Sequence, residues 1–371
     1  MKPNFILKGH ILFSRTLETM DVTENGYLVC ADGVCAGVYA EIPEAYAGLP
    51  VYDCGDKLIV PGFTDLHVHA PQYTFRSLGM DMELLDWLNT YTFPEEARYA
   101  DPAYAAQAYD LFTQELRRSA TTRACIFATL HREATEILMR KLDESGLRTY
   151  VGKVNMDRNS PDDLREASAA ASLDDTRRWL DEVGGLTNCK PILTPRFTPS
   201  CTDELMAGLG DLQQQTGLPV QSHLSENQGE IDWVRELCPN TADYGEAYSQ
   251  FGLFGENGPC IMAHCVHCTD HEIDAMRQNG VFVAHCPQSN TNLASGIAPV
   301  RRYLKDGLRI GLGTDVAGGA HLSVFRALTD AVAVSKLRWR LADQSLTPLT
   351  FAEAFFLATR GGGAFFGKVG A

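Results

Sequence analysis

Several features are missing from this 371-residue sequence, and each absence excludes a class of protein. No apolar run approaches the roughly 20 residues that a membrane-spanning helix needs, so no membrane association is expected. Residues 1–10 contain one short apolar run without a small-residue cleavage site after it, which is not the pattern of a signal peptide. Lys and Arg form no basic cluster, and the formal net charge is −15. A nucleic-acid polymer is therefore not an expected partner, and any base-like ligand is a small free molecule.

The cysteines also lack the arrangement of a disulfide framework. They number eleven, an odd count, and lie scattered along the chain. Reduced thiols in a cytoplasmic protein fit this usage better than disulfides do. Cys265, Cys268 and Cys286 lie near histidines and can in principle bind a metal. Most free cysteines, however, are small buried apolar residues, and that interpretation is favoured.

Two patterns divide the chain. Residues 1–58 alternate short β-prone runs with turn residues, which predicts a small β-sandwich-like module. From residue 59 to residue 371, apolar strands alternate with amphipathic helices, which predicts an α/β fold, a (β/α)8 TIM barrel. A doubly wound open sheet is the competitor, but no strand is followed by a phosphate-binding glycine loop. The expected barrel strands are 58–63, 122–129, 149–154, 191–197, 219–223, 260–265, 281–286 and 310–314.

The most informative motif is His67-Val68-His69, which follows the first expected barrel strand. In an extended strand, side chains at i and i+2 share a face, so both imidazoles can point at one metal ion. Alone, the motif is equally consistent with two polar side chains at a strand end that bind no metal. Further polar residues stand at the ends of later expected strands, namely His223, His264, His285 and Asp315. Because barrel enzymes place catalysis at the carboxyl ends of their strands, these side chains are expected to meet.

Four of these residues match a catalytic divalent-metal site. His67, His69, His223 and Asp315 would supply three nitrogens and one oxygen and leave a position open for water. Such an ion lowers the pKa of water to ~7 and so provides hydroxide at neutral pH. Glu226, three residues after His223, can move a proton as general base and then general acid. Its alternative is a glutamate in the first turn of a helix, favoured there by the helix dipole.

Two histidines keep open roles at this stage. His264 is either a ligand or a residue that hydrogen-bonds the water or the developing oxygen. His285 begins a polar run that either lines the pocket or satisfies loop backbone. The fourth strand ends at Arg196 and Phe197 without a lysine, so a carbamylated lysine bridging two metals has no obvious source. One metal ion is therefore favoured.

Taken together, these residues resemble the amidohydrolase superfamily and, within it, the guanine deaminases. The superfamily pattern is the set of histidines and the aspartate described above. The more specific part is the pair of runs at 70–73 and 87–95, and the run at 87–95 is similar to the substrate lid of the guanine deaminases. Supporting matches are 195–197, 222–227, 285–290 and 311–319.

The resemblance implies a hydrolase that deaminates guanine to xanthine and ammonia in purine catabolism or salvage. It implies one Zn²⁺ bound by His67, His69, His223 and Asp315. It also implies Glu226 as the proton shuttle, with His264 and Asp315 as further catalytic residues, and a homodimer as the assembly. The implied substrate contacts are Gln72, Arg196, Phe197, His69 and His223.

Other interpretations of these residues, and other functions, stay open. The side-chain amide of Gln72 and the guanidinium of Arg196 suit hydrogen bonds to a planar polar base, but a solvated loop residue and a structural ion pair are the ordinary interpretations. A related deaminase or dehalogenase acting on another aminopurine, a pterin or a triazine is a second hypothesis. A non-catalytic scaffold is a third, and the complete ligand set speaks against it. Guanine deaminases usually continue past residues 361–370 into strands that complete the small β domain, so exposed strand edges are expected here.

Overall fold

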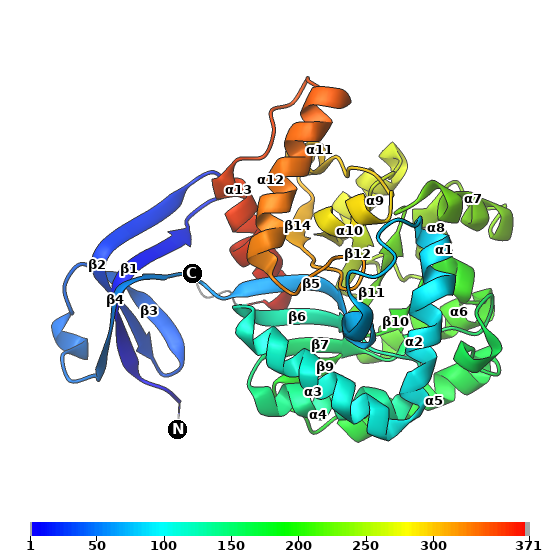
Figure 1. Cartoon of the computed structure of the whole chain (residues 1–371), viewed down its shortest axis with the longest axis horizontal. Helices are drawn as coiled ribbons and strands as arrows, with labels where there is room; N and C mark the ends of the chain where they lie inside the picture. Colours follow the sequence, from blue (N-terminus) through cyan, green and yellow to red (C-terminus); the bar gives the residue numbers. More distant parts are fainter. Residues whose placement is uncertain (1, 368–371) are drawn as a thin grey trace.

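The computed structural model describes residues 2–367 and contains a barrel preceded by a separate small sheet (Figure 1). In the described residues, the small sheet has the strand order β3-β2-β1-β4. Its strands are β1 (Phe5–Ser14), β2 (Met20–Ala31), β3 (Val34–Tyr39) and β4 (Val51–Ile59). Strand β1 pairs antiparallel with β2 and parallel with β4, and most of β4 is exposed. This sheet stands beside the barrel, to its left in Figure 1.

The barrel is closed in the described part of the chain. One parallel sheet has the order β5-β6-β7-β9 and another the order β11-β12-β13-β14. Leu193 lies on the chain after β9 and its N–H donates to the carbonyl of Pro219 at 2.9 Å, while the Asp315 N–H donates to the carbonyl of His67 at 2.9 Å. These bonds join the two sheets at both edges, which confirms the predicted (β/α)8 barrel. Its strands are β5 (Phe63–His69), β6 (Thr121–Phe127), β7 (Arg148–Gly152), β8 (Val154–Asn155), β9 (Cys189–Pro191), β10 (Thr194–Pro195), β11 (Val220–Leu224), β12 (Cys260–His264), β13 (Phe282–His285) and β14 (Arg309–Leu312).

Helices surround the barrel (Figure 1). Thr269 and Glu272 form a reciprocal capping box at the start of α9, and Gly280 ends the helix in the left-handed conformation. Between residues 2 and 367, no helix is both long and apolar enough to cross a membrane. The longer helices are α3 (Pro102–Arg118), α4 (Arg132–Ser145), α5 (Ala169–Val183), α6 (Asp203–Thr216), α7 (Gln228–Leu237), α9 (Asp270–Asn279) and α12 (Val324–Leu341). The shorter ones are η1 (Glu44–Tyr46), η2 (Ala70–Phe75), α1 (Leu84–Trp87), η3 (Leu88–Thr92), α2 (Phe93–Ala97), η4 (Arg98–Ala100), η5 (Asp162–Leu164), η6 (Thr198–Ser200), α8 (Tyr244–Ser249), α10 (Pro287–Asn292), α11 (Val300–Lys305), α13 (Phe351–Phe356), η7 (Leu357–Gly361) and η8 (Ala364–Phe366).

The expected position of the first barrel strand, residues 58–63, is wrong. Strand β4 of the small sheet ends at Ile59, and the barrel strand β5 begins only at Phe63. Pro61 lies between them, and proline cannot donate a hydrogen bond to a sheet. Thr64 and Asp65 are polar but fully buried, so the sequence of β5 is not a continuous apolar run. The two histidines of the His-x-His motif therefore lie within β5 rather than beyond its end.

The barrel interior is filled by apolar side chains below the histidines. The interior cluster consists of Leu66, Cys125, Ile192, Ile261, Ala263, Phe282, Ala284 and Phe365. Strand residues alternate, so Ile261 and Ala263 of β12 face this cluster. Because the interior is packed, the polar ends of the strands are left to form a site at one face of the barrel.

Gly152, at the end of β7, tests how closely neighbouring strands approach. A Cβ added there would lie 1.7 Å from Thr194 Oγ1 and 2.8 Å from the backbone oxygen of Ile192. We expect Gly152→Ala to lower the free energy of unfolding by about 1–3 kcal/mol, because the strand or the threonine must shift. A Cβ added at Gly185 meets nothing within 4 Å. Gly185→Ala should therefore change the free energy of unfolding by less than about 0.5 kcal/mol. Urea denaturation measures both, and equal midpoints would contradict the expectation.

Candidate active site

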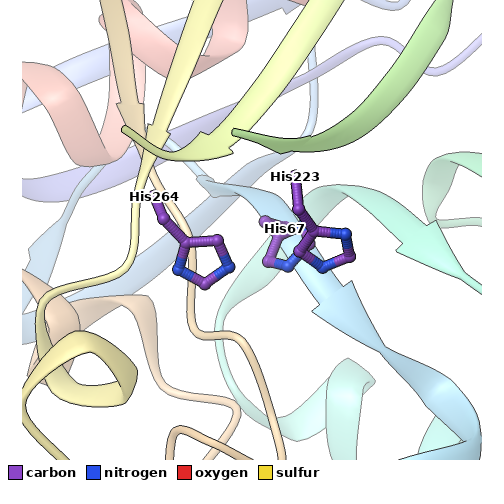
Figure 2. A group of neighbouring side chains, drawn as sticks. All are labelled: His67, His223 and His264. Carbon is purple, nitrogen blue, oxygen red and sulfur yellow. The ribbon is translucent and has the colours of Figure 1, made fainter. Parts of the chain in front are cut away.

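Imidazole and carboxylate groups from separate strands meet at the carboxyl face of the barrel. Figure 2 shows the rings of His67, His223 and His264, which come from β5, β11 and β12. The Nε2 atom of His69 lies 3.2 Å from His67 Nε2 and 3.3 Å from His223 Nε2. Asp315 Oδ1 lies 3.1 Å from His67 Nε2 and 3.5 Å from His69 Nε2. The structure thus brings together the residues that the sequence analysis assigned to the metal.

The chemistry of this cluster fits a metal ion. His223 Nδ1 lies 2.6 Å from the carbonyl oxygen of Arg196, so Nδ1–H donates there and the Nε2 lone pair faces the cluster. Burial, and then the proximity of His67, lowers the pKa of His69 and of His223 well below the usual value. The rings are therefore neutral, so each can offer a nitrogen lone pair to a cation. Three such nitrogens and one carboxylate are a donor set that Zn²⁺ prefers.

The carboxylate of the cluster is held in its charged form. Burial alone would raise the pKa of Asp315, but the nearby histidines His67, His264 and His69 together outweigh that effect and the pKa is lowered. Asp65 lies in the same strand as His67. It accepts hydrogen bonds from the backbone N–H of Thr314 at 3.0 Å and from that of His67 at 3.2 Å. Burial raises the pKa of Asp65 to about 6. Asp65 thereby ties the end of β14 to β5 and fixes the separation of two cluster residues.

Glu226 lies beside the cluster and is 3% exposed. Its Oε2 is 3.3 Å from His264 Nε2, and its Oε1 accepts a hydrogen bond from Ser295 Oγ at 3.0 Å. Burial, and then the charge of Asp315, raises its pKa to about 8. Glu226 precedes Asn227, the N-cap of α7, so it is not a glutamate of the helix's first turn. A buried carboxyl group with this pKa can hold or release a proton near neutral pH.

His264 is fixed by a partner on the opposite side of its ring. His264 Nδ1 lies 2.8 Å from Asn290 Oδ1, and its Nε2 is 3.8 Å from Asp315 Oδ2. With Nδ1–H donated to the asparagine, Nε2 faces Glu226 and the cluster. His264 Nε2 can thus either contact a metal or hydrogen-bond a reacting oxygen, so both roles stay open.

A pocket open to solvent covers the cluster at the carboxyl face of the barrel. Three of its apolar residues come from α1 and the start of η3, the segment that resembles a substrate lid. Gln72, Arg196 and Phe197 also line it, where the sequence analysis expected substrate contacts. The full lining is His69, Gln72, Leu84, Trp87, Leu88, Arg196, Phe197, His223, Glu226, Glu230, His264, Leu293 and Asp315.

Two residues with open roles lie outside that lining. His285 is 1% exposed, and burial, followed by the proximity of His264, lowers its pKa to about 3. Cys286 lies within ligand reach of His264 and Asp315. Burial raises the pKa of the Cys286 thiol well above the usual value, and its Sγ donates to the carbonyl of Ala284 at 3.5 Å. A protonated thiol is a poor metal ligand, so this cysteine is better described as a buried small residue.

Sequence reasoning missed two glutamates that hold site residues. Glu230 Oε1 accepts a hydrogen bond from the backbone N–H of Glu226 at 2.7 Å. Glu96 Oε2 accepts one from Arg196 Nη1 at 2.5 Å. The spacing of Glu226 and Glu230 on either side of a helix start is a local signal that could have indicated the first contact. Glu96 and Arg196 are 100 residues apart, and no local pattern indicates the second contact.

Comparisons with known proteins agree with this geometry. The Amidohydrolase family pattern matches residues 58–371. Guanine deaminase of Dictyostelium discoideum is 43% identical over 314 residues, covering 84% of this chain and 69% of that protein. Guanine deaminase of Rattus norvegicus is 39% identical over 310 residues, covering 82% of this chain and 67% of that protein. A crystal structure of guanine deaminase from C. acetobutylicum, with guanine bound in its active site, is 45% identical with a TM-score of 0.97, covering 100% of this chain and 88% of that one.

Proposed function

The chain belongs to the amidohydrolase family, and from that premise we propose that it catalyses the hydrolytic deamination of guanine to xanthine and ammonia. The observation that carries the proposal is the pocket in which Gln72 and Arg196 stand beside the imidazole and carboxylate cluster. Its relatives named above are guanine deaminases, and one of them holds guanine in a closely similar fold. A homodimer in the cytoplasm, acting in purine catabolism or salvage, completes the proposal.

One Zn²⁺ would be held by His67, His69, His223 and Asp315. When bound, the ion supplies a water molecule whose pKa is lowered to ~7. The protein's own contribution is to keep the three imidazoles neutral by burial and to fix their orientation. The hydrogen bond from His223 to the carbonyl of Arg196 does this for one ring, at 2.6 Å.

The pocket can orient a planar base by its polar edge. Arg196 has only donors, so it can bind a ring carbonyl oxygen but cannot accept from an amino group at that position. Gln72 offers an amide beside it, and Phe197 and Trp87 supply aromatic walls. This arrangement favours guanine, with its oxygen at C6, over adenine, which carries an amino group there. The amino group at C2 would then face the cluster.

Glu226 is placed to move the proton. As the oxygen of water forms its bond to C2, Glu226 accepts a proton from that water, and it then donates the proton to the amino nitrogen. During the addition the C2=N3 π electrons become a lone pair on ring N3. The bond from C2 to the amino nitrogen then breaks and ammonia leaves, while the second proton of the water passes from the C2 oxygen to N3 and that oxygen stays on the ring as the carbonyl of xanthine. His264, held by Asn290 at 2.8 Å, faces the same region and can hydrogen-bond the oxygen during the addition.

Ammonia release from guanine by the purified protein, supplied with Zn²⁺, tests the proposal directly. Adenine, cytosine and a pterin serve as alternative substrates, and chelator-treated protein serves as the control. We expect release from guanine that is lost on chelation. Release from another ring in preference to guanine would replace the substrate assignment, and a folded, zinc-loaded protein without activity on any ring would contradict the enzymatic function.

A further inference from the structure

Glu96 contacts both polar side chains that the proposed function assigns to the substrate edge. Glu96 Oε2 accepts from Arg196 Nη1 at 2.5 Å, and its Oε1 accepts from Arg196 Nη2 at 3.1 Å. The same Oε1 accepts from Gln72 Nε2 at 2.9 Å. The exposed fractions are 1% for Glu96, 2% for Gln72 and 3% for Arg196, so water does not compete for these bonds. One buried carboxylate thus holds two pocket residues at once.

These bonds leave defined groups free for a ligand. A guanidinium has five N–H donors, and Glu96 takes one from each terminal nitrogen of Arg196. Gln72 has its amide orientation fixed at both ends, because its Nε2 donates to Glu96 and its Oε1 accepts from the N–H of Ala317 at 3.1 Å. A carboxylate can only accept, so the amide cannot turn over without losing both bonds. Donors therefore remain on Arg196 and Gln72 in set directions.

Glu96 also connects this edge to the lid segment. It lies in α2, which follows α1 and η3, where pocket residues Trp87 and Leu88 are found. The ring of Phe93, also in α2, lies 5.2 Å from Arg196 Cζ. Gln72 lies in η2 and Arg196 just after β10, so the two come from distant parts of the chain. The carboxylate of Glu96 therefore holds the lid segment and the two base-contacting residues together.

We propose that Glu96 is a positioning residue that sets the specificity of the pocket for a ring carbonyl over a ring amino group. The inference rests on the proposed function, and it adds the group that aims the donors. Without the carboxylate, the guanidinium keeps its charge but is free to turn, and Gln72 can present its oxygen to an amino group. The preference for an oxygen over an amino group at C6 of the purine should then fall, even though no residue that contacts the substrate has changed.

The experiment compares guanine with 2,6-diaminopurine, which keeps the amino group at C2 but replaces the C6 oxygen by an amino group. We expect Glu96→Gln to lower kcat/KM for guanine on the order of 10²-fold, mainly through a higher KM, because misplaced contacts weaken substrate binding. The ratio of the two kcat/KM values should move towards 2,6-diaminopurine. This ratio does not depend on the fraction of folded protein, so a purely structural role would leave it unchanged.

Glu115→Gln is the matched control. Glu115 lies in α3 and also pairs with an arginine, Arg118 Nη1 at 2.8 Å, but it lies outside the lid segment and does not line the pocket. We expect its substrate ratio to equal that of the unchanged protein. Glu96→Asp, which keeps the charge but shortens the reach, is a further variant should the glutamine variant fold poorly, and its ratio should move in the same direction. An unchanged ratio in both Glu96 variants would overturn the positioning role, whereas an unchanged protein inactive on guanine would overturn the proposed function instead.

Discussion

Glu226→Gln should lower kcat for ammonia release about 10²–10⁴-fold, which is the usual contribution of a positioned proton-transfer group. Glutamine keeps the size of the side chain and can still accept from Ser295 Oγ, which donates to Glu226 Oε1 at 3.0 Å. It cannot take a proton from water or give one to the leaving amine. Steady-state kinetics on guanine, together with the zinc content of the purified variant, measure the effect.

A neighbouring glutamate separates loss of the shuttle from general damage. Glu236 lies on the exposed side of α7, the helix that follows Glu226. Glu236→Gln should leave kcat, zinc content and melting temperature unchanged. A Glu226→Gln protein that binds zinc and retains full turnover would show that another group carries the proton, and His264, 3.3 Å away, would be the next to test.

The barrel and the meeting of its histidines were predictable because both follow from short repeating patterns. Strand side chains alternate with period two, which places His67 and His69 on one face, and parallel strands in a barrel end at one rim. The residues at the ends of the later expected strands, His223, His264 and Asp315, are therefore brought to the same place. The distances among them required the structure. They depend on hydrogen bonds such as that of His223 to the carbonyl of Arg196, at 2.6 Å.

The remaining parts of the site depend on contacts that no local pattern contains. Glu96 lies in a short helix whose sequence is that of an ordinary acidic segment, and its partner Arg196 is 100 residues away. Ser295 donates to Glu226 across a gap of 69 residues. The first barrel strand was misplaced for a related reason. Its buried polar residue Asp65 accepts a hydrogen bond at 3.0 Å from the N–H of Thr314, which follows the neighbouring strand β14, and this long-range contact helps to make its burial favourable.

Removing the metal should abolish turnover and also lower stability. The Nε2 atoms of His67, His69 and His223 approach one another to 3.2 and 3.3 Å beside the Asp315 carboxylate, so a cation bound among them should stabilise the folded state. We expect dialysis against a chelator to remove activity in proportion to the zinc lost, and zinc added back to restore both. A ligand present at 100 times its Kd stabilises the folded state by about 2.7 kcal/mol, so the melting temperature should rise on zinc addition.

Variants show whether the effect arises at this cluster. His67→Gln should bind zinc more weakly and lose most of the zinc-dependent rise in melting temperature, because one of the nitrogen donors is gone. His271→Gln is the matched control, since His271 lies on α9 with 63% of its side chain exposed, and it should keep the full rise. Melting temperature with and without zinc is a readout independent of catalysis. If His67→Gln retained the same zinc-dependent rise as His271→Gln, the stabilising metal would have to bind elsewhere, and the assignment of the metal to this cluster would be wrong.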